Sequence, residues 1–228
     1  MKSACFAAVA LLGAVTLAAP AIAEARTDTE RVDRTVPIRA GGQLRLKNFS
    51  GKVVISGTNR GDMAVHAIRR ASRDRLDHIK LEIVETGSGV TIEANKRDSS
   101  WDEHNNNVVE TDFDIEVPVD VSLDIQVFSS DVAVKDVRGR QRVKTFSGEI
   151  DIRDAWGSLN TETFSGAISV KLTPSVGGHL DFDSFSGSLK SDVPFQFRSS
   201  SRRHVSGDLG SGSNDYRFKT FSGDVTIR

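Results

Sequence analysis

The sequence predicts an all-β protein, a parallel β-solenoid with two short strands in each coil of about 18–21 residues. Three observations predict this fold: a Phe-Ser-Gly motif that recurs along the chain, apolar and polar residues that alternate on both sides of it, and no helical periodicity between the copies. A less regular N-terminal β region containing a hairpin is expected to precede the coils.

The repeats are marked by Phe-Ser-Gly, one outward residue, and then an apolar-x-apolar segment. The phenylalanines are Phe49, Phe128, Phe146, Phe164, Phe185 and Phe221, and the glycines are Gly51, Gly148, Gly166, Gly187, Gly207 and Gly223. Two copies depart from the motif, with Ser130 in place of glycine and Val205 in place of phenylalanine. From Phe128 onward the copies are 18, 18, 21, 20 and 16 residues apart, a period too short for most helical repeats.

The alternation changes phase inside each copy. Apolar residues lie at odd offsets before the phenylalanine and at even offsets after it, so a flat strand would point the two sets to opposite faces. We therefore expect the chain to turn a corner at Ser-Gly, where glycine reaches positive φ without a Cβ penalty. One coil cannot bury its apolar face alone, so we expect the copies to stack in chain order at a strand spacing of ~4.8 Å.

Residues 1–23 have the pattern of a cleavable export signal. Lys2 precedes an apolar run, and Ala21-Ile22-Ala23 is a small-x-small cleavage site. The run is short for a membrane span, so we expect no transmembrane segment in the mature protein, which would be periplasmic or secreted. The one cysteine, Cys5, lies inside the signal, which excludes a disulfide and a thiol nucleophile from the mature chain.

We expect one domain after the signal. Residues 24–40 are polar and are predicted to be a poorly ordered N-terminal segment, followed by a single β-solenoid domain over 41–228. Within it, residues 41–122 are predicted to form a β cap and 123–228 the repeat coils. In the cap, 79–83 and 90–94 alternate as the strands of a hairpin, 111–117 is a strand, and 71–77 is a short helix. A cap is expected because an open solenoid end is an exposed sheet edge.

Three further stretches accompany the repeats: Ile115-Glu116-Val117-Pro118 before Leu123-Asp124-Ile125, the glycine-rich turn at 205–212, and the closing strand pair at 218–225. Together with the repeats they resemble the bacterial putative-adhesin β-solenoid domains of unknown function, and they are similar to auto-transporter adhesin head domains of the GIN type. The resemblance covers about residues 40–228. It implies an exported β-solenoid and supplies no catalytic residues.

The phenylalanine column has two interpretations. It is either an exposed aromatic stripe that binds glycan, peptide or another copy of the chain, or a ladder buried in the corner as part of the core. Because large exposed apolar patches are uncommon on monomers, we expect the buried ladder. Exposure of the rings above about one third would reverse that preference.

The polar residues give no convergent site. An acidic column follows the glycines at Asp131, Glu149, Asp208 and Asp224, where paired carboxylates would suit glycoside hydrolysis and stacked oxygens would suit calcium. Ala167 and Ser188 interrupt the column, so we expect solvated outward side chains. The five histidines lack metal-ligand spacing, and we expect no catalytic residue, metal or cofactor. Two basic clusters, around Arg69 and around Arg203, are expected to be solvated surface.

These observations favour an exported, non-enzymatic, adhesin-like binding or scaffolding module of the bacterial cell envelope. Its partner would be an envelope or surface ligand: a glycan, a protein or another copy of itself. Lys plus Arg is 30 against 31 Asp plus Glu, and this balance argues against nucleic acid. The alternatives are a carbohydrate-active β-helix enzyme acting on polysaccharide, and self-association through the open ends of the solenoid.

Overall fold

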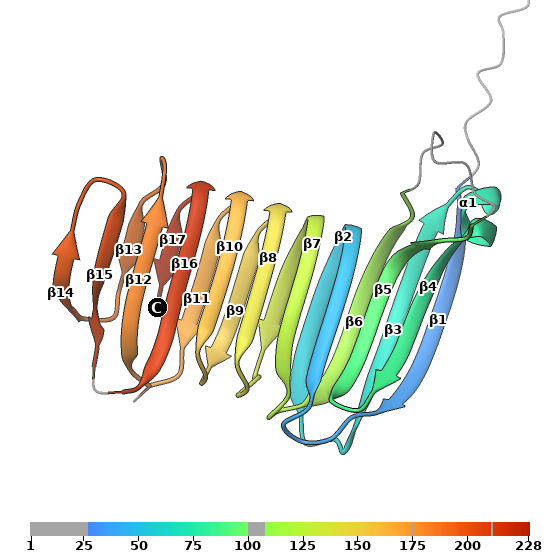
Figure 1. The fold of residues 1–228 in the computed structure, drawn as a ribbon, viewed down its shortest axis with the longest axis horizontal. Helices are drawn as coiled ribbons and strands as arrows, with labels where there is room; N and C mark the ends of the chain where they lie inside the picture. The colour runs from blue at the N-terminus through green and yellow to red at the C-terminus, as the bar shows by residue number, and fades with distance from the viewer. Residues whose placement is uncertain (1–26, 100–107, 175, 211) are drawn as a thin grey trace, which may run out of the picture.

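The computed structural model describes residues 27–99, 108–174, 176–210 and 212–228. The expected export signal and Trp101, which we expected to fold back onto the solenoid wall, lie outside these residues. Over the described residues the chain is all-β with one short helix, and its strands form a mixed parallel and antiparallel sheet that does not close on itself (Figure 1).

The elements are bounded as follows. The N-terminal part contains β1 (Asp28–Pro37), β2 (Gln43–Thr58), β3 (Asp62–Ala71), α1 (Arg73–His78), β4 (Ile79–Thr86), β5 (Gly89–Arg97) and β6 (Glu110–Pro118). The central part contains β7 (Ser122–Lys135), β8 (Gln141–Ser147), β9 (Ile150–Ala155), β10 (Leu159–Ser165) and β11 (Ile168–Leu172). The C-terminal part contains β12 (Gly178–Ser184), β13 (Leu189–Ser191), β14 (Phe195–Ser200), β15 (His204–Leu209), β16 (Asn214–Ser222) and β17 (Val225–Ile227).

Antiparallel pairs close the N-terminal end of the stack. β1 pairs with β3, β3 pairs with β6, and β4 and β5 form the expected hairpin, in which Thr86 is opposite Gly89 (Figure 1). The expectation that residues 24–40 are poorly ordered is wrong for most of the segment. Val32, Val36 and other residues of β1 face β3, whose ladder satisfies the backbone of this polar stretch.

Parallel pairs in strict register connect the motif copies. Ser129 is opposite Ser50 and Ser147, and Ser165 is opposite Ser147 and Ser222, so equivalent motif residues lie side by side. We call each such copy a rung. The first copy lies in β2, which pairs with β7 from Gln43 to Ser56. Its assignment to the cap region is therefore corrected: it is a rung of the repeat stack.

The rungs do not stack in chain order. β16 lies between β10 and β12, with Thr220 opposite both Thr163 and Ser184, and β17 lies likewise between β11 and β13 (Figure 1). The last copy is thus the fifth of six rungs. The hairpin of β14 and β15 covers one edge of β12 by antiparallel pairing. The copy at Phe221 therefore pairs with the other edge of β12, between β12 and β10.

The copy at Val205-Ser206-Gly207 is not a rung. It belongs to β15, where Gly207 is opposite Leu180 of β12 and Phe197 of β14 in antiparallel ladders. The prediction that Gly207 forms a repeat corner is therefore wrong. A Cβ at Gly207 would lie 2.5 Å from the Gln196 carbonyl oxygen, so close strand packing accounts for this glycine.

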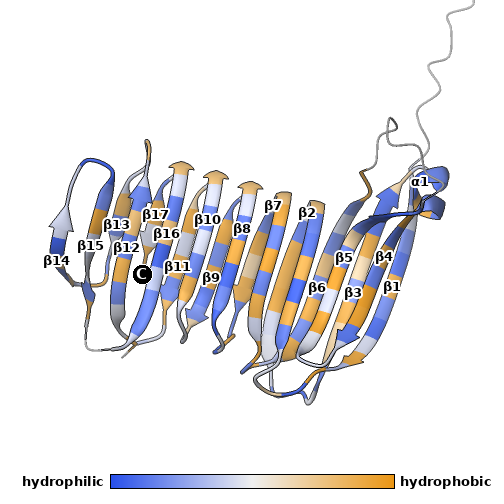
Figure 2. Cartoon of the chain, viewed as in Figure 1, coloured by the Kyte–Doolittle hydropathy of each residue, from blue (hydrophilic) through white to orange (hydrophobic). Residues whose placement is uncertain are grey.

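The core lies between the two layers of each rung. Along β7, Leu123, Ile125, Val127, Val132 and Val134 are buried, and Asp124, Gln126 and Ala133 between them face outward as the alternation predicts. Equivalent positions of the other rungs form apolar bands across the strands (Figure 2). The phase changes between Val127 and Val132, which places the corner where the sequence predicts it.

Close approach between neighbouring rungs requires the corner glycines. A Cβ at Gly166 would lie 2.1 Å from the Gly148 carbonyl oxygen, and one at Gly187 would lie 1.9 Å from that of Gly223. Positive φ, which we expected to explain the motif, occurs at Gly51 (112°), Gly148 (153°) and Gly166 (149°) but not at Gly187 or Gly223. Steric exclusion of a side chain is therefore the common cause.

Candidate binding groove

The six motif phenylalanines form one continuous stack, which we call the phenylalanine column. In spatial order they are Phe49, Phe128, Phe146, Phe164, Phe221 and Phe185, with centroids 4.6–4.9 Å apart and interplanar angles of 0–16°. The register of the parallel strands imposes this spacing because equivalent residues of adjacent strands are one strand separation apart.

The column is exposed, which corrects the expectation of a buried ladder. Between 39% and 52% of each of the six residues is accessible to solvent. In each strand the residue before the phenylalanine points inward instead, as Thr145, Thr163 and Thr220 do. The faces of the rings pack against neighbouring phenylalanines and not against the core, so mainly the ring edges are exposed to solvent.

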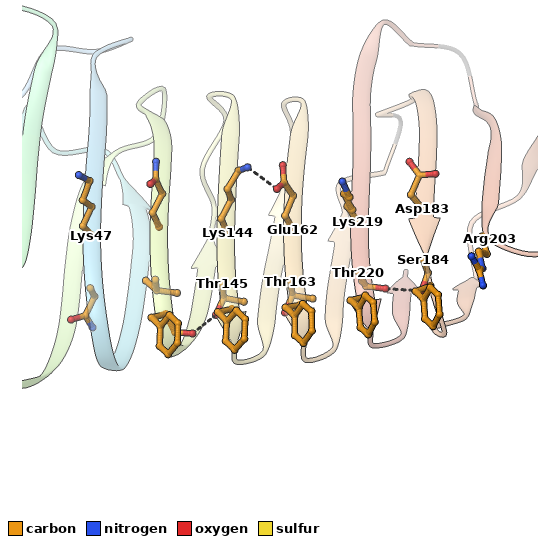
Figure 3. A pocket seen from close by; sticks show the side chains of 18 residues that line it. Lys47, Lys144, Thr145, Glu162, Thr163, Asp183, Ser184, Arg203, Lys219 and Thr220 are labelled. Carbon is orange, nitrogen blue, oxygen red and sulfur yellow. Dashed lines mark hydrogen bonds and ion pairs between the residues drawn. The ribbon is translucent and has the colours of Figure 1, made fainter. Parts of the chain in front are cut away.

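A groove of about 810 Å³ runs beside the column across six strands (Figure 3). Its other wall is the polar column, made of the residues two positions before each phenylalanine. In spatial order the polar column is Lys47, Gln126, Lys144, Glu162, Lys219 and Asp183. The groove therefore combines an aromatic wall with a wall that carries both positive and negative charges.

Ion pairs and one cation–π contact organise the charged side chains of the groove. Lys144 Nζ lies 2.6 Å from Glu162 Oε2, and His204 Nδ1 lies 2.9 Å from Asp183 Oδ1 (Figure 3 shows the first pair). The Arg203 guanidinium lies 4.3 Å from the centroid of Phe185 and covers the end of the column. Arg203 is exposed, as we expected of this cluster, and in addition its guanidinium contacts an aromatic face.

The acidic column links rungs to one another. Asp131 Oδ1 accepts a hydrogen bond from the Glu149 amide at 2.9 Å, and Asp224 Oδ1 accepts bonds from the Ser188 hydroxyl at 2.7 Å and amide at 2.9 Å. The hydroxyl bond, followed by the amide bond, lowers the pKa of Asp224 below its ordinary value of 3.8. These carboxylates satisfy backbone amides at the corners, which is more than the solvated role we expected.

Asp208 does not belong to the acidic column. It lies in β15, where its carboxylate contacts Arg198 Nε at 2.6 Å and His179 Nδ1 at 3.2 Å. The hydrogen bond from Arg198 is the main cause that lowers the pKa of Asp208.

The first basic cluster is divided between the interior and the surface. Arg69 is buried in β3 and bonds to the Glu30 carboxylate and to the Ile79 carbonyl oxygen, whereas Arg70 pairs with Asp112 at 2.6 Å. The expectation of a solvated cluster is therefore wrong for Arg69. The alternation could have revealed this, because Arg69 continues the inward set of Met63, Val65 and Ala67.

No group of three or more His, Cys, Asp or Glu residues suitable for a metal occurs among the residues that the structure describes. In the same part of the chain, no helix has the length and apolar character needed to cross a membrane. The polar column is the feature that sequence reasoning missed. Its signal was present, since a polar residue lies two positions before each motif phenylalanine.

The paired strands and the exposed phenylalanine column define an all-β domain with a surface groove. A family model described as Toastrack DUF4097 matches residues 111–228, and the chain belongs to this family of domains of unknown function. A search of curated proteins found no match.

Two solved bacterial structures are similar to this chain. A putative cell adhesion protein from Clostridium sporogenes aligns with 88% of this chain and 99% of its own, at 12% identity and a TM-score of 0.64. A putative adhesin from Bacteroides fragilis aligns with 87% of this chain and 97% of its own, at 10% identity and a TM-score of 0.33. At these identities the first similarity establishes the fold, and the second carries no argument.

Proposed function

We propose that the chain is an exported, non-enzymatic, adhesin-like binding module of the bacterial cell envelope, built as a parallel β-solenoid, and that the groove is its binding surface. The exposed phenylalanine column is the observation that supports this proposal most directly. Six half-exposed aromatic rings in one row exceed what a surface without a partner needs.

The export signal and the domain boundaries complete the proposal. The pattern of residues 1–23 supports export to the periplasm or beyond, and parallel register over the six rungs supports a single repeat domain within 41–228. Strand β1 lies before that boundary and pairs with β3, so we extend the proposed domain to begin at Asp28.

The arrangement of the rings favours a broad apolar contact over sugar stacking. A sugar that stacks on an aromatic residue needs an open ring face, whereas Phe128, Phe146 and Phe164 each have a ring on both sides. Ring edges form a continuous apolar ridge, which suits the surface of a protein. The charged wall beside the ridge would set the orientation of the partner.

Matched variants test whether the groove is the binding surface. Phe146→Ser removes a ring that is 47% exposed from the middle of the groove, and Trp156→Ser removes a residue that is 45% exposed from a turn outside it. Each variant and the wild type would be presented to a glycan array, to phospholipid vesicles and to immobilised wild-type protein. We expect binding to fall at least tenfold in Phe146→Ser and to remain unchanged in Trp156→Ser.

Two results would contradict the proposal. Equal binding by Phe146→Ser and wild type, with both proteins folded at the assay temperature, would place the binding surface elsewhere. Turnover of an envelope polysaccharide by the purified protein would replace a binding module with an enzyme.

A further inference from the structure

We propose that the partner of the groove is a second copy of this chain, which packs face to face and antiparallel along the phenylalanine column. This inference rests on the proposed function of the groove as a binding surface. It predicts a two-fold symmetric dimer whose axis runs along the strand direction and passes between β8 and β10.

The geometry of this dimer follows from its symmetry. A two-fold axis along the strands reverses the order of the rungs and keeps each column opposite its own copy. The first rung, containing Phe49, then faces the last, containing Phe185. Phenylalanines face phenylalanines, and the polar column faces the polar column of the other copy.

The charges of the polar column are complementary under this reversal. Lys47 faces Asp183 of the other copy, and Lys144 faces Glu162, so all four charges are opposite an unlike charge. Gln126 faces Lys219, which places the remaining lysine opposite a neutral amide. The six positions therefore make no like-charge contact.

A second column shows the same pattern independently. The residues four positions before each phenylalanine are, in spatial order, Arg45, Asp124, Arg142, Asn160, Arg217 and Asp181. Reversal places Arg45 opposite Asp181, Asp124 opposite Arg217, and Arg142 opposite Asn160. This column also makes no like-charge contact.

The charges also select a single register. Sliding one copy by one rung places Lys144 opposite itself in one direction and Glu162 opposite itself in the other. A parallel arrangement places every charge opposite its own kind. Because like charges across an interface are costly, the centred antiparallel register is the favoured one.

The size of the face is sufficient for a specific contact. Six strands at ~4.8 Å and about six residues of each at ~3.4 Å give a footprint of roughly 600 Å² on each copy. Roughly 1,200 Å² over both copies reaches the lower bound of specific interfaces. The phenylalanine edges supply the apolar part and the two charged columns the polar part.

Charge reversal at the two ends of the polar column tests the arrangement. Lys47 and Asp183 are five rungs apart, about 24 Å, which exceeds the screening length of ~8 Å, so they do not interact within one copy. Lys47→Glu and Asp183→Lys each create two like-charge pairs in the dimer. We expect each to weaken dimerisation of the full chain at least tenfold by sedimentation equilibrium.

Mixing the two variants is the decisive measurement. In a heterodimer of Lys47→Glu with Asp183→Lys, both terminal pairs are again of opposite charge. We therefore expect the mixture to associate with an affinity close to that of the wild type, although each variant alone does not. A chain carrying both substitutions should also recover wild-type dimerisation.

Gln126 provides a second test that leaves the Asp183 contact with His204 intact. Gln126→Glu faces Lys219 with an opposite charge and should tighten the dimer several-fold, whereas Gln126→Lys should loosen it. Phe197→Lys serves as a control, because Phe197 lies on the outer strand β14, away from the groove. It should leave dimerisation unchanged.

Three outcomes would overturn the inference: a wild-type protein that is monomeric at about 100 μM, a mixture no tighter than its components, or loss of association in Phe197→Lys. A monomeric wild type combined with loss of vesicle or glycan binding in Phe146→Ser would remove the second copy as partner and keep the groove as the binding surface. Association unaffected by Phe146→Ser, Lys47→Glu and Asp183→Lys would remove both proposals.

Discussion

The rings of Phe164 and Phe221 stack at a centroid distance of 4.6 Å and an interplanar angle of 6°. Phe185 lies between them in the sequence, yet it stacks on the far side of Phe221 at 4.8 Å. The strands β16 and β17, which contain the copy at Phe221, thus form an internal rung of the stack. The order of the rungs, and with it the order of charges along the groove, depends on this insertion.

The corner glycines give the first prediction. Gly166→Ala places a Cβ 2.1 Å from the Gly148 carbonyl oxygen and 2.8 Å from its carbonyl carbon, so the backbone of the neighbouring strand would have to shift. We expect a loss of about 3 kcal/mol in the free energy of unfolding, measured by urea denaturation. Gly61→Ala, where a Cβ would meet nothing within 4 Å, should change it by less than about 0.5 kcal/mol. Similar effects of the two would mean that the rungs are not in close contact.

The buried hydroxyls give a second prediction. Thr161 Oγ1 is buried without a hydrogen-bond partner among the described residues, so Thr161→Val should raise the free energy of unfolding by about 1 kcal/mol. Thr220 Oγ1 lies 2.9 Å from Ser184 Oγ and 3.0 Å from the Gly223 carbonyl oxygen. Thr220→Val should therefore lower it by about 1–3 kcal/mol. If both variants changed the free energy of unfolding in the same direction, the difference in hydrogen bonding between Thr161 and Thr220 would be contradicted.

Ring stacking gives a third prediction. Phe146 stacks on two rings, and Phe49 is an end ring that stacks on Phe128. Because one aromatic pair contributes about 0.5–1.5 kcal/mol, Phe146→Ala should cost about 2 kcal/mol and Phe49→Ala about 1 kcal/mol. Calorimetric melting of both variants checks this order, and a greater loss in Phe49→Ala would be inconsistent with the stack.

The carboxylate of Asp224 gives a prediction about pH. A carboxylate whose pKa is lowered by folding stabilises the protein above its ordinary pKa, and this stability is lost as the pH falls through the lowered pKa. The wild type should therefore melt at a higher temperature than Asp224→Asn at pH 6. The difference should disappear as the pH falls below 3.8, the ordinary value. A difference that stays constant down to pH 2 would exclude a role for the charge.

The strands and the corners could be predicted from the sequence because they depend on local pattern. Leu123, Ile125, Val132 and Val134 specify a phase change that only a corner satisfies, and Thr86–Gly89 specifies a hairpin. The order of the rungs could not be predicted in this way. Every rung presents similar side chains to its neighbours. The local sequence therefore does not specify that the copy at Phe221 lies between the copies at Phe164 and Phe185.

The candidate groove was only partly predictable. Parity alone placed Phe146 and its equivalents outside the inward set, but the general rarity of exposed apolar patches favoured burial. Stacking resolves the conflict, because each ring loses its faces to its neighbours while its edges stay in solvent. The charge pattern of the polar column depends on the spatial order of the rungs, and that order cannot be predicted from the local sequence pattern.

The position of the final rung has a consequence for how the molecule is made. During synthesis from the N-terminus, β2, β7, β8 and β10 can pair one after another, because each pairs with a strand that precedes it in the sequence. The strand β12 is synthesised before β16, the strand that lies between β12 and β10 in the folded protein. Until β16 has been made, β12 cannot be connected to β10 through it. The strand β12 gains its parallel neighbour only after residues 214–222 have been synthesised, so this part of the stack does not form in the order of synthesis.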